Sequence, residues 1–159
     1  MMRVSVTGVE CGYNDGDPEG FRPGTVRLGP QLGAQRTGAT VWELPPGEAA
    51  CPYHYELGEE EWLLVLSGTP SVRTPDGVEQ LAPDDVVFFP PGPDGAHQLR
   101  NDSDATARVL MWSNVGFPAA AVYPDSDKVG LFHNRPDMNA LFRRTTQVDY
   151  FDGEVPRRD

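Results

Sequence analysis

The stretch PPGEAACPYHYELGEEEWLLVLSG, residues 45–68, decides the class of fold. Its second half contains the apolar run Trp62–Leu66, which ends at the turn pair Ser67-Gly68. The run is short and rich in aromatic and branched side chains, which suits a buried β-strand better than a helix. The first half begins with two prolines and a glycine, which end any regular element before it.

Similar short apolar segments lie on both sides of this stretch. They are ATVWEL (39–44), SVRT (71–74), VEQL (78–81), DVVFF (85–89) and TARVLMW (106–112). The turn Pro75-Asp76-Gly77 separates the second and third and predicts a hairpin. Strands of about five residues that recur every eight to twelve residues are typical of a β-sandwich or small barrel. A short helix is expected only at residues 139–144.

Composition excludes several classes of function. Of 159 residues, 17 are glycine and 16 are proline, so the chain must turn often. The net charge of −11 opposes binding to nucleic acid or to an anionic membrane surface. No apolar run approaches the roughly 20 residues needed to cross a bilayer, and the N-terminus lacks a secretion signal. Two cysteines are too few for a disulfide scaffold. We expect a soluble, cytoplasmic all-β domain.

Two of the three histidines lie beside expected strands. In an extended segment the side chains of His54 and Glu56 point the same way, and Glu61 begins the apolar strand that follows. His97 precedes another strand. Nitrogen and oxygen ligands from separate strands can hold Mn, Fe, Zn or Ni.

Spacing alone leaves other interpretations open. Glu61 belongs to a run of three glutamates, and such a residue is more often a solvated charge at a strand edge. A histidine beside a turn is more often a surface or capping residue than a metal ligand. Cys51 suits a buried free thiol, and His133 a structural or solvent-facing residue.

Two motifs then point to a known family. Gly47, His54, Glu56, Glu61 and Gly68 together resemble the first signature of the cupin superfamily, in which a glycine precedes a His-x-His pair, a glutamate and a second glycine. This chain has one extra residue between Gly47 and His54, and Glu56 stands in place of the second histidine.

The second cupin signature is similar to a later stretch. Asp84, Pro90, Gly92, His97 and Asn101 match its order, although Asp84 replaces a glycine and two extra residues precede His97. The segments YPDSDKVG (123–130) and VDYFDGE (148–154) resemble a bacterial group of small single-domain cupins.

The resemblance implies a cupin double-stranded β-helix, or jelly-roll barrel, at residues 39–115. Residues 1–38 would form an irregular N-terminal arm packed on the barrel or on a partner, and residues 116–159 an irregular C-terminal extension. It also implies one divalent transition metal held by His54, Glu61 and His97, with Glu56 in the fourth place. Glu56 either ligates through oxygen or turns away and leaves an incomplete site.

The implied function is that of a metal-dependent enzyme acting on a small oxygen-bearing molecule, as an oxygenase, isomerase, decarboxylase or lyase. The alternatives are a non-catalytic cupin that binds a small ligand beside a degenerate metal site, and a structural role. Tyr53, Tyr55 and Arg73 are candidates for the pocket lining, although such aromatics are mostly core and such arginines mostly exposed. The resemblance also implies a homodimer.

Overall fold

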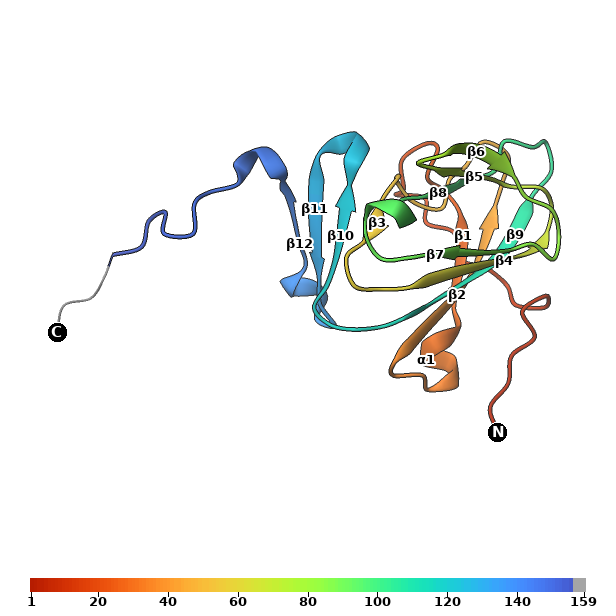
Figure 1. The fold of residues 1–159 in the computed structure, drawn as a ribbon. Coiled ribbons are helices and arrows are strands. Elements are labelled where there is room, and N and C mark those ends of the chain that lie inside the picture. Colours follow the sequence, from red (N-terminus) through yellow and green to blue (C-terminus); the bar gives the residue numbers. More distant parts are fainter. Residues whose placement is uncertain (156–159) are drawn as a thin grey trace.

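The computed structural model describes residues 1–155, and β-strands dominate it (Figure 1). The largest sheet has five strands, all antiparallel to their neighbours. Their spatial order is β1 (Gly24–Arg27), β2 (Thr37–Leu44), β9 (Ala107–Asn114), β4 (Glu61–Ser67) and β7 (Val86–Phe89). The apolar runs expected to form strands supply β2, β4, β7 and β9.

A smaller sheet shares its core with the large one. It consists of β6 (Gly77–Gln80), β5 (Ser71–Thr74) and β8 (Gln98–Arg100), and β5 and β6 form the hairpin expected around Pro75-Asp76-Gly77. Leu63 and Val65 of β4 join Val72 and Leu99 of this sheet in one buried apolar cluster. Alternate residues of β4 are buried because one face of the strand points into that cluster.

The N-terminal segment contributes to the main sheet. β1 pairs with β2 and forms one edge of the sheet, and the short helix α1 (Leu28–Leu32) follows it directly. Farther upstream, Gly12 forms a β-bridge with Thr25, and the Arg108 guanidinium donates a hydrogen bond to the Val9 carbonyl at 2.9 Å. Parts of the segment before residue 38 therefore contact the five-stranded sheet. Among residues 1–155, no helix is long and apolar enough to cross a membrane.

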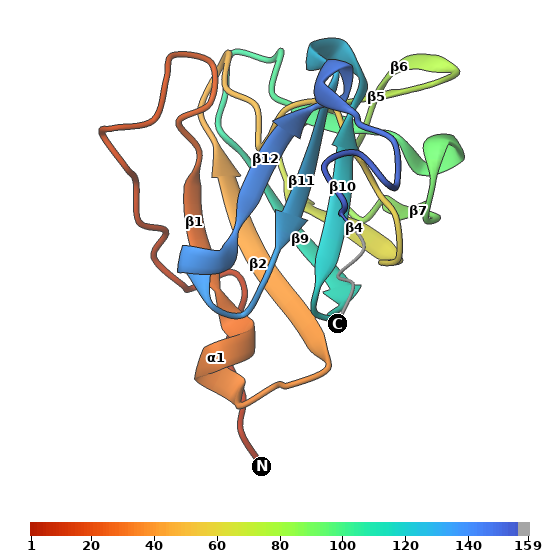
Figure 2. The same cartoon turned by 90° about the vertical axis from the view of Figure 1, so that its left-hand side faces the viewer.

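The C-terminal region differs from the expectation of an irregular segment. It forms β10 (Ala119–Tyr123), β11 (Lys128–Phe132) and β12 (Ala140–Arg143), which make a sheet together with β3 (Tyr55–Glu56). Figures 1 and 2 show this sheet beside the barrel, with the chain after β12 running away from it. Alanine and glycine give these segments weak strand signals, so pairing with neighbours determines their structure.

The expected helix at residues 139–144 is the clearest correction. Residues 140–143 instead form β12, which pairs with β11 in the register Leu131↔Ala140 to Lys128↔Arg143. Tertiary hydrogen bonding overrides the local helical tendency of this segment. The helices besides α1 are single 3₁₀ turns at Pro93–Gly95, Pro124–Ser126, Pro136–Met138 and Arg144–Thr146.

Candidate metal centre

A backbone bridge places two histidines side by side. The His54 amide donates to the His97 carbonyl at 3.0 Å, and the His97 amide donates to the His54 carbonyl at 2.8 Å. His54 directly precedes β3 and His97 directly precedes β8. The two imidazole centroids consequently lie 4.8 Å apart, although 42 residues separate the two histidines in the chain.

Both rings are held in the same tautomer. Nδ1 of His54 lies 3.0 Å from the Pro52 carbonyl oxygen, and Nδ1 of His97 lies 2.9 Å from the Gly95 carbonyl oxygen. A carbonyl can accept a hydrogen bond but cannot donate one, so each Nδ1 carries the proton. Each Nε2 of a neutral ring therefore presents a lone pair, as in histidines that bind metals.

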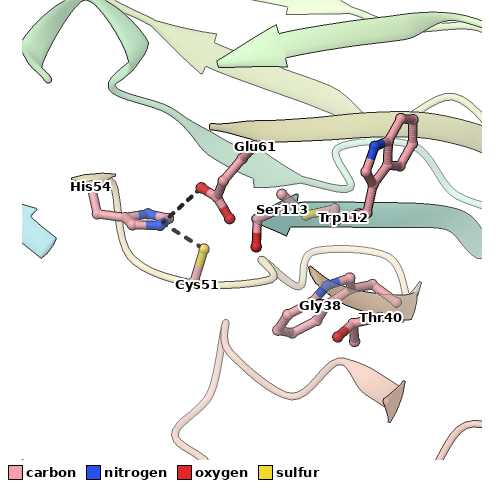
Figure 3. Close-up of a pocket in the computed structure, with 9 residues that line it drawn as sticks. Gly38, Thr40, Cys51, His54, Glu61, Trp112 and Ser113 are labelled. Atoms are coloured by element: carbon pink, nitrogen blue, oxygen red, sulfur yellow. Dashed lines mark hydrogen bonds and ion pairs between the residues drawn. The ribbon is translucent and has the colours of Figure 1, made fainter. Parts of the chain in front are cut away.

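Glu61 faces these lone pairs from β4. Its Oε2 lies 3.9 Å from Nε2 of His54 and 3.6 Å from Nε2 of His97, and Figure 3 shows its carboxylate directed at His54. One potential ligand atom from each of the three residues lies within 4.8 Å of the others. Zn–N and Zn–O bonds are about 2.0–2.2 Å long, so the Glu61 oxygen can share one ion with either Nε2 atom at 3.6 and 3.9 Å.

Glu56 lies beside His54 at the edge of this cluster. It belongs to β3, and its Oε1 is 3.7 Å from Nε2 of His54. The two-residue spacing puts both side chains on one side of the extended segment, as the sequence predicts. Glu56 is thus next to the cluster of His54, Glu61 and His97, and closest to His54 within it.

Burial shapes the charge of the four groups. Burial lowers the pKa of His54, and burial with the neighbouring His54 lowers the pKa of His97 to about 4. Burial, together with the negative charges of Glu61 and Glu59, raises the pKa of Glu56 to about 8. Burial, together with the negative charge of Glu59, raises the pKa of Glu61 to about 7. Both rings are therefore neutral near pH 7, and the causes that shift the pKa of the two carboxyls are burial and acidic neighbours.

This donor set fits a divalent cation. The His97 side chain is 1% exposed, and among the described residues its Nε2 has no hydrogen-bond partner. A buried nitrogen without a partner is costly, and an ion at this point would satisfy it. The same ion would stabilise the two crowded carboxylates, because its charge opposes theirs.

A cavity of about 220 Å³ opens onto His54 and Glu61. The cavity residues that the sequence analysis missed come from β2 and β9, and include Thr40, Trp42, Met111 and Ser113. Strand parity could have found most of them. Trp42 and Thr40 lie two and four residues before the buried Leu44, and Met111 lies two residues after the buried Val109.

Aromatic rings also surround the histidines outside this cavity. The ring of Phe89 stacks on His97 with centroids 3.7 Å apart, and the ring of Tyr123 stacks on His54 at 5.8 Å. Phe89 belongs to an expected strand, but Tyr123 arrives from β10 in the C-terminal sheet. No local signal in the sequence connects Tyr123 with His54.

The three residues expected to line a pocket lie elsewhere. Tyr53 is buried, and the Arg73 guanidinium lies 3.9 Å above its ring. Arg73 makes two hydrogen bonds to Asp125, at 2.6 and 2.9 Å, and its side chain is 41% exposed. Tyr55 belongs to β3 and pairs with Val122.

The two other candidates also have defined places. Sγ of Cys51 lies 3.6 Å from Nδ1 of His54, and Figure 3 shows the thiol at the wall of the cavity. Burial, together with Glu61 and Glu56, raises the pKa of Cys51 to about 12, so the thiol remains neutral. His133 lies after β11, outside the cluster.

Comparison with known families identifies the barrel. Residues 40–113 match a family model described as a cupin domain. This part of the chain is a cupin domain. The matched residues of this cupin run from within β2 to within β9 and include all four residues around the centre. A comparison with curated proteins found no match.

Solved structures agree with this fold. A sugar phosphate isomerase from Silicibacter pomeroyi DSS-3 is 22% identical to this cupin, with a TM-score of 0.79 and coverage of 95% of this chain and 98% of that one. A protein from Acidithiobacillus ferrooxidans ATCC 23270, named for the same activity, is 22% identical, with a TM-score of 0.78 and coverages of 96% and 93%.

The description of a third structure names the double-stranded β-helix that the sequence predicts. This protein from Klebsiella pneumoniae subsp. pneumoniae MGH 78578 has a double-stranded β-helix domain and is 18% identical, with a TM-score of 0.58 over 74% of this chain and 92% of that one. The expectation of an all-β cupin fold is confirmed. At these identities the likeness concerns the fold alone.

Proposed function

We propose that this cupin binds one divalent transition metal ion, Fe, Mn, Zn or Ni, through His54, Glu61 and His97, with Glu56 as a fourth ligand. We further propose that it is an enzyme acting on a small oxygen-bearing molecule. One observation carries the proposal: two Nε2 lone pairs and a carboxylate oxygen converge, and the buried Nε2 of His97 has no partner among the described residues.

A bound ion would supply Lewis acidity toward an oxygen atom of the substrate. The chain itself would hold the ion at the buried end of the cavity and admit the substrate past His54 and Glu61. Oxygenase, isomerase, decarboxylase and lyase reactions all use such polarisation, and a fold does not select among them. The name of the two similar structures, sugar phosphate isomerase, belongs to the isomerase type.

Metal content per chain tests this proposal. Protein purified without a polyhistidine tag is incubated with each metal, desalted and measured by mass spectrometry. We expect about one equivalent of ion in the wild type and a loss of at least tenfold in affinity in His97→Ala, because one of the ligands is removed. His133→Ala is the matched control, since it removes a histidine outside the cluster. Unchanged stoichiometry in His97→Ala would disprove the ligand assignment.

A second function is favoured by Glu56. Its carboxyl replaces the second histidine of the family signature, and burial with the neighbouring Glu61 raises its pKa to about 8, so a metal ion has to compete with a proton for this group. A protonated carboxyl is a poor metal ligand, so the chain could instead be a non-catalytic cupin that binds a small ligand beside a degenerate metal site. Metal content near zero after incubation, with small-molecule binding retained, would favour this function.

We also propose that two copies form a homodimer in the cytoplasm. Large apolar side chains are exposed after β12, including Tyr150 at 89% and Phe151 at 76%. A second copy would bury such a surface. Both cysteines are free, which suits a reducing compartment.

A further inference from the structure

The described wall of the cavity at the candidate metal centre contains no positively charged side chain. Among residues 1–155, no lysine or arginine lines it. Apart from the candidate ligands, its polar side-chain groups include the hydroxyls of Thr40 and Ser113 and the thiol of Cys51, which are neutral near pH 7. Figure 3 shows the Ser113 hydroxyl near the Glu61 carboxylate and Thr40 farther along the cavity. The negative groups at this site thus have no positive side chain to oppose them within the wall.

Two arginines on strands of the barrel are already paired. Arg73 is bound by both oxygens of Asp125 and lies over Tyr53. Arg108 of β9 pairs with Glu43 at 2.9 Å. Its side chain points to the face of β9 opposite Met111, because successive residues of a strand alternate in direction. Neither guanidinium is placed to bind an anion in the cavity.

A phosphorylated ligand would therefore be poorly held. A divalent ion only balances the two carboxylates Glu56 and Glu61, so a phosphate dianion would add uncompensated charge to a mostly buried site. The net charge of −11 would also repel it from the protein as a whole. Phosphate recognition normally relies on arginine, lysine or backbone N–H groups at a helix N-terminus.

The apolar part of the wall indicates what would be held instead. Trp42 and Met111 face the cavity from β2 and β9. Trp42 and Cys51 also border a second cavity of about 510 Å³, whose lining includes Phe21, Pro23 and Pro52. Asp17 is the charged residue of that lining among the described residues, and it is negative. Once a divalent ion balances the two carboxylates, a flat aromatic face in an otherwise neutral cavity wall favours an uncharged planar molecule.

We propose that this site accepts a small, uncharged, planar, oxygen-bearing compound, not a sugar phosphate, and that Trp42 is the residue that selects it. This inference rests on the proposed metal-binding function. At about 220 Å³ the cavity is smaller than the roughly 300–1,000 Å³ of typical ligand pockets, so the compound is about the size of a single ring. Its oxygens would face His54 and Glu61, and its ring would lie against Trp42.

Calorimetric titration of the metal-incubated protein tests the inference, with metal content measured before and after. The three probes are maltol, which is an uncharged planar hydroxypyranone, D-ribose, and D-ribose 5-phosphate. We expect maltol to bind at least tenfold more tightly than either sugar, and the phosphate to give no gain over ribose. Tighter binding of ribose 5-phosphate than of maltol would overturn the inference.

Variants at Trp42 test the claim that this residue selects the planar compound. Trp42→Leu keeps an apolar side chain but removes the flat aromatic face. It should therefore weaken maltol binding about threefold to tenfold. Trp42→Phe should retain most of the affinity, and both variants should keep the wild-type metal content. Trp62→Leu is the matched control, because Trp62 lies on the opposite face of β4 from Glu61. Unchanged maltol binding in a folded Trp42→Leu would overturn the assignment of Trp42.

The metal measurement separates this inference from the proposed function. About one equivalent of metal with preferred binding of ribose 5-phosphate overturns the inference and leaves the proposed function standing. Metal content near zero with Trp42-dependent binding of maltol overturns the proposed function and supports the ligand class. Metal content near zero without binding of maltol overturns both.

Discussion

Glu56 is the residue at which this cupin departs most from the family signature. Its carboxyl lies 3.7 Å from Nε2 of His54, and burial with the neighbouring Glu61 raises its pKa to about 8. Near pH 7 a metal ion would have to displace a proton from Glu56 in order to bind it. An imidazole at this position would be neutral and would offer a nitrogen lone pair.

Glu56→His should therefore tighten the binding of Ni²⁺ or Zn²⁺ by about tenfold or more at pH 7. Competition with a chromophoric chelator measures the dissociation constant. Glu60→His is the control, because it adds a histidine to the same segment at an exposed position. An affinity equal to that of the wild type would mean that the side chain at position 56 does not reach the ion.

At the scale of elements, Asn101 joins the ends of two strands. Its side-chain amide is fully buried and donates to the carbonyls of Leu44 at 2.7 Å and Ala105 at 2.8 Å. It thereby connects the end of β2 to the loop after β8. This matched residue of the second signature is a structural anchor in the fold, since it lies outside the cluster of His54, Glu61 and His97.

Asn101→Ala should lower the free energy of unfolding by about 1–3 kcal/mol, because the buried Leu44 carbonyl loses its donor and the link to the Ala105 carbonyl is lost. Urea denaturation measures this change, and metal content should remain at the wild-type level. The exposed Asn114 provides the comparison, and Asn114→Ala should cost less than about 1 kcal/mol. Equal costs for the two variants would contradict the anchoring role.

Gly68 directly follows β4, where its backbone lies close to the backbone of Ala107. Its φ is +78°, and a Cβ at this position would lie 2.6 Å from Cα of Ala107. Gly47 has a similar φ of +83°, but a Cβ there would meet no atom within 4 Å. The two signature glycines therefore share one backbone conformation and differ in the space around it.

Gly68→Ala should destabilise the protein by about 2 kcal/mol more than Gly47→Ala does, because only the first substitution adds a steric clash to the strain of a positive φ. Thermal and urea unfolding of both variants measure the difference. Similar losses in the two proteins would show that the chain near Ala107 moves aside at little cost.

At the scale of the whole molecule, apolar surface collects in two places. The outer face of the five-stranded sheet carries Trp62, which lies 4.6 Å from Phe88 and 6.0 Å from Trp112 between ring centroids. The chain after β12 carries Tyr150 and Phe151 and runs away from the barrel (Figure 1). Such surfaces on a strongly acidic protein favour association with a specific partner over general aggregation.

Sedimentation should give a species of about twice the 17.4 kDa chain mass for the wild type at micromolar concentration. Tyr150→Ser combined with Phe151→Ser should shift it toward the monomer, because the exposed aromatics would no longer be buried by the second copy. Val78→Ser, at an exposed position on β6, should leave the dimer intact. A monomeric wild type would refute the proposed homodimer.

The sequence by itself determined the barrel strands and most of the candidate centre. The segments that form β2, β4, β7 and β9 are short, lie between strong turns, and are either apolar throughout or alternate between apolar and polar residues. Such local patterns predict strands from the sequence alone. The resemblance to the two cupin signatures likewise named His54, Glu56, Glu61 and His97, whereas spacing alone left a solvated Glu61 and capping histidines open.

Only the tertiary structure decided the rest. The strands β10, β11 and β12 depend on pairing with β3 and with one another, and the stacking of Tyr123 on His54 results from that pairing. The absence of lysine and arginine from the described cavity wall also needed the assembled fold, because Arg73 could have faced inward until Asp125 was seen to hold it. Contacts between segments far apart in sequence leave no local signature, and here they set the charge and shape of the site.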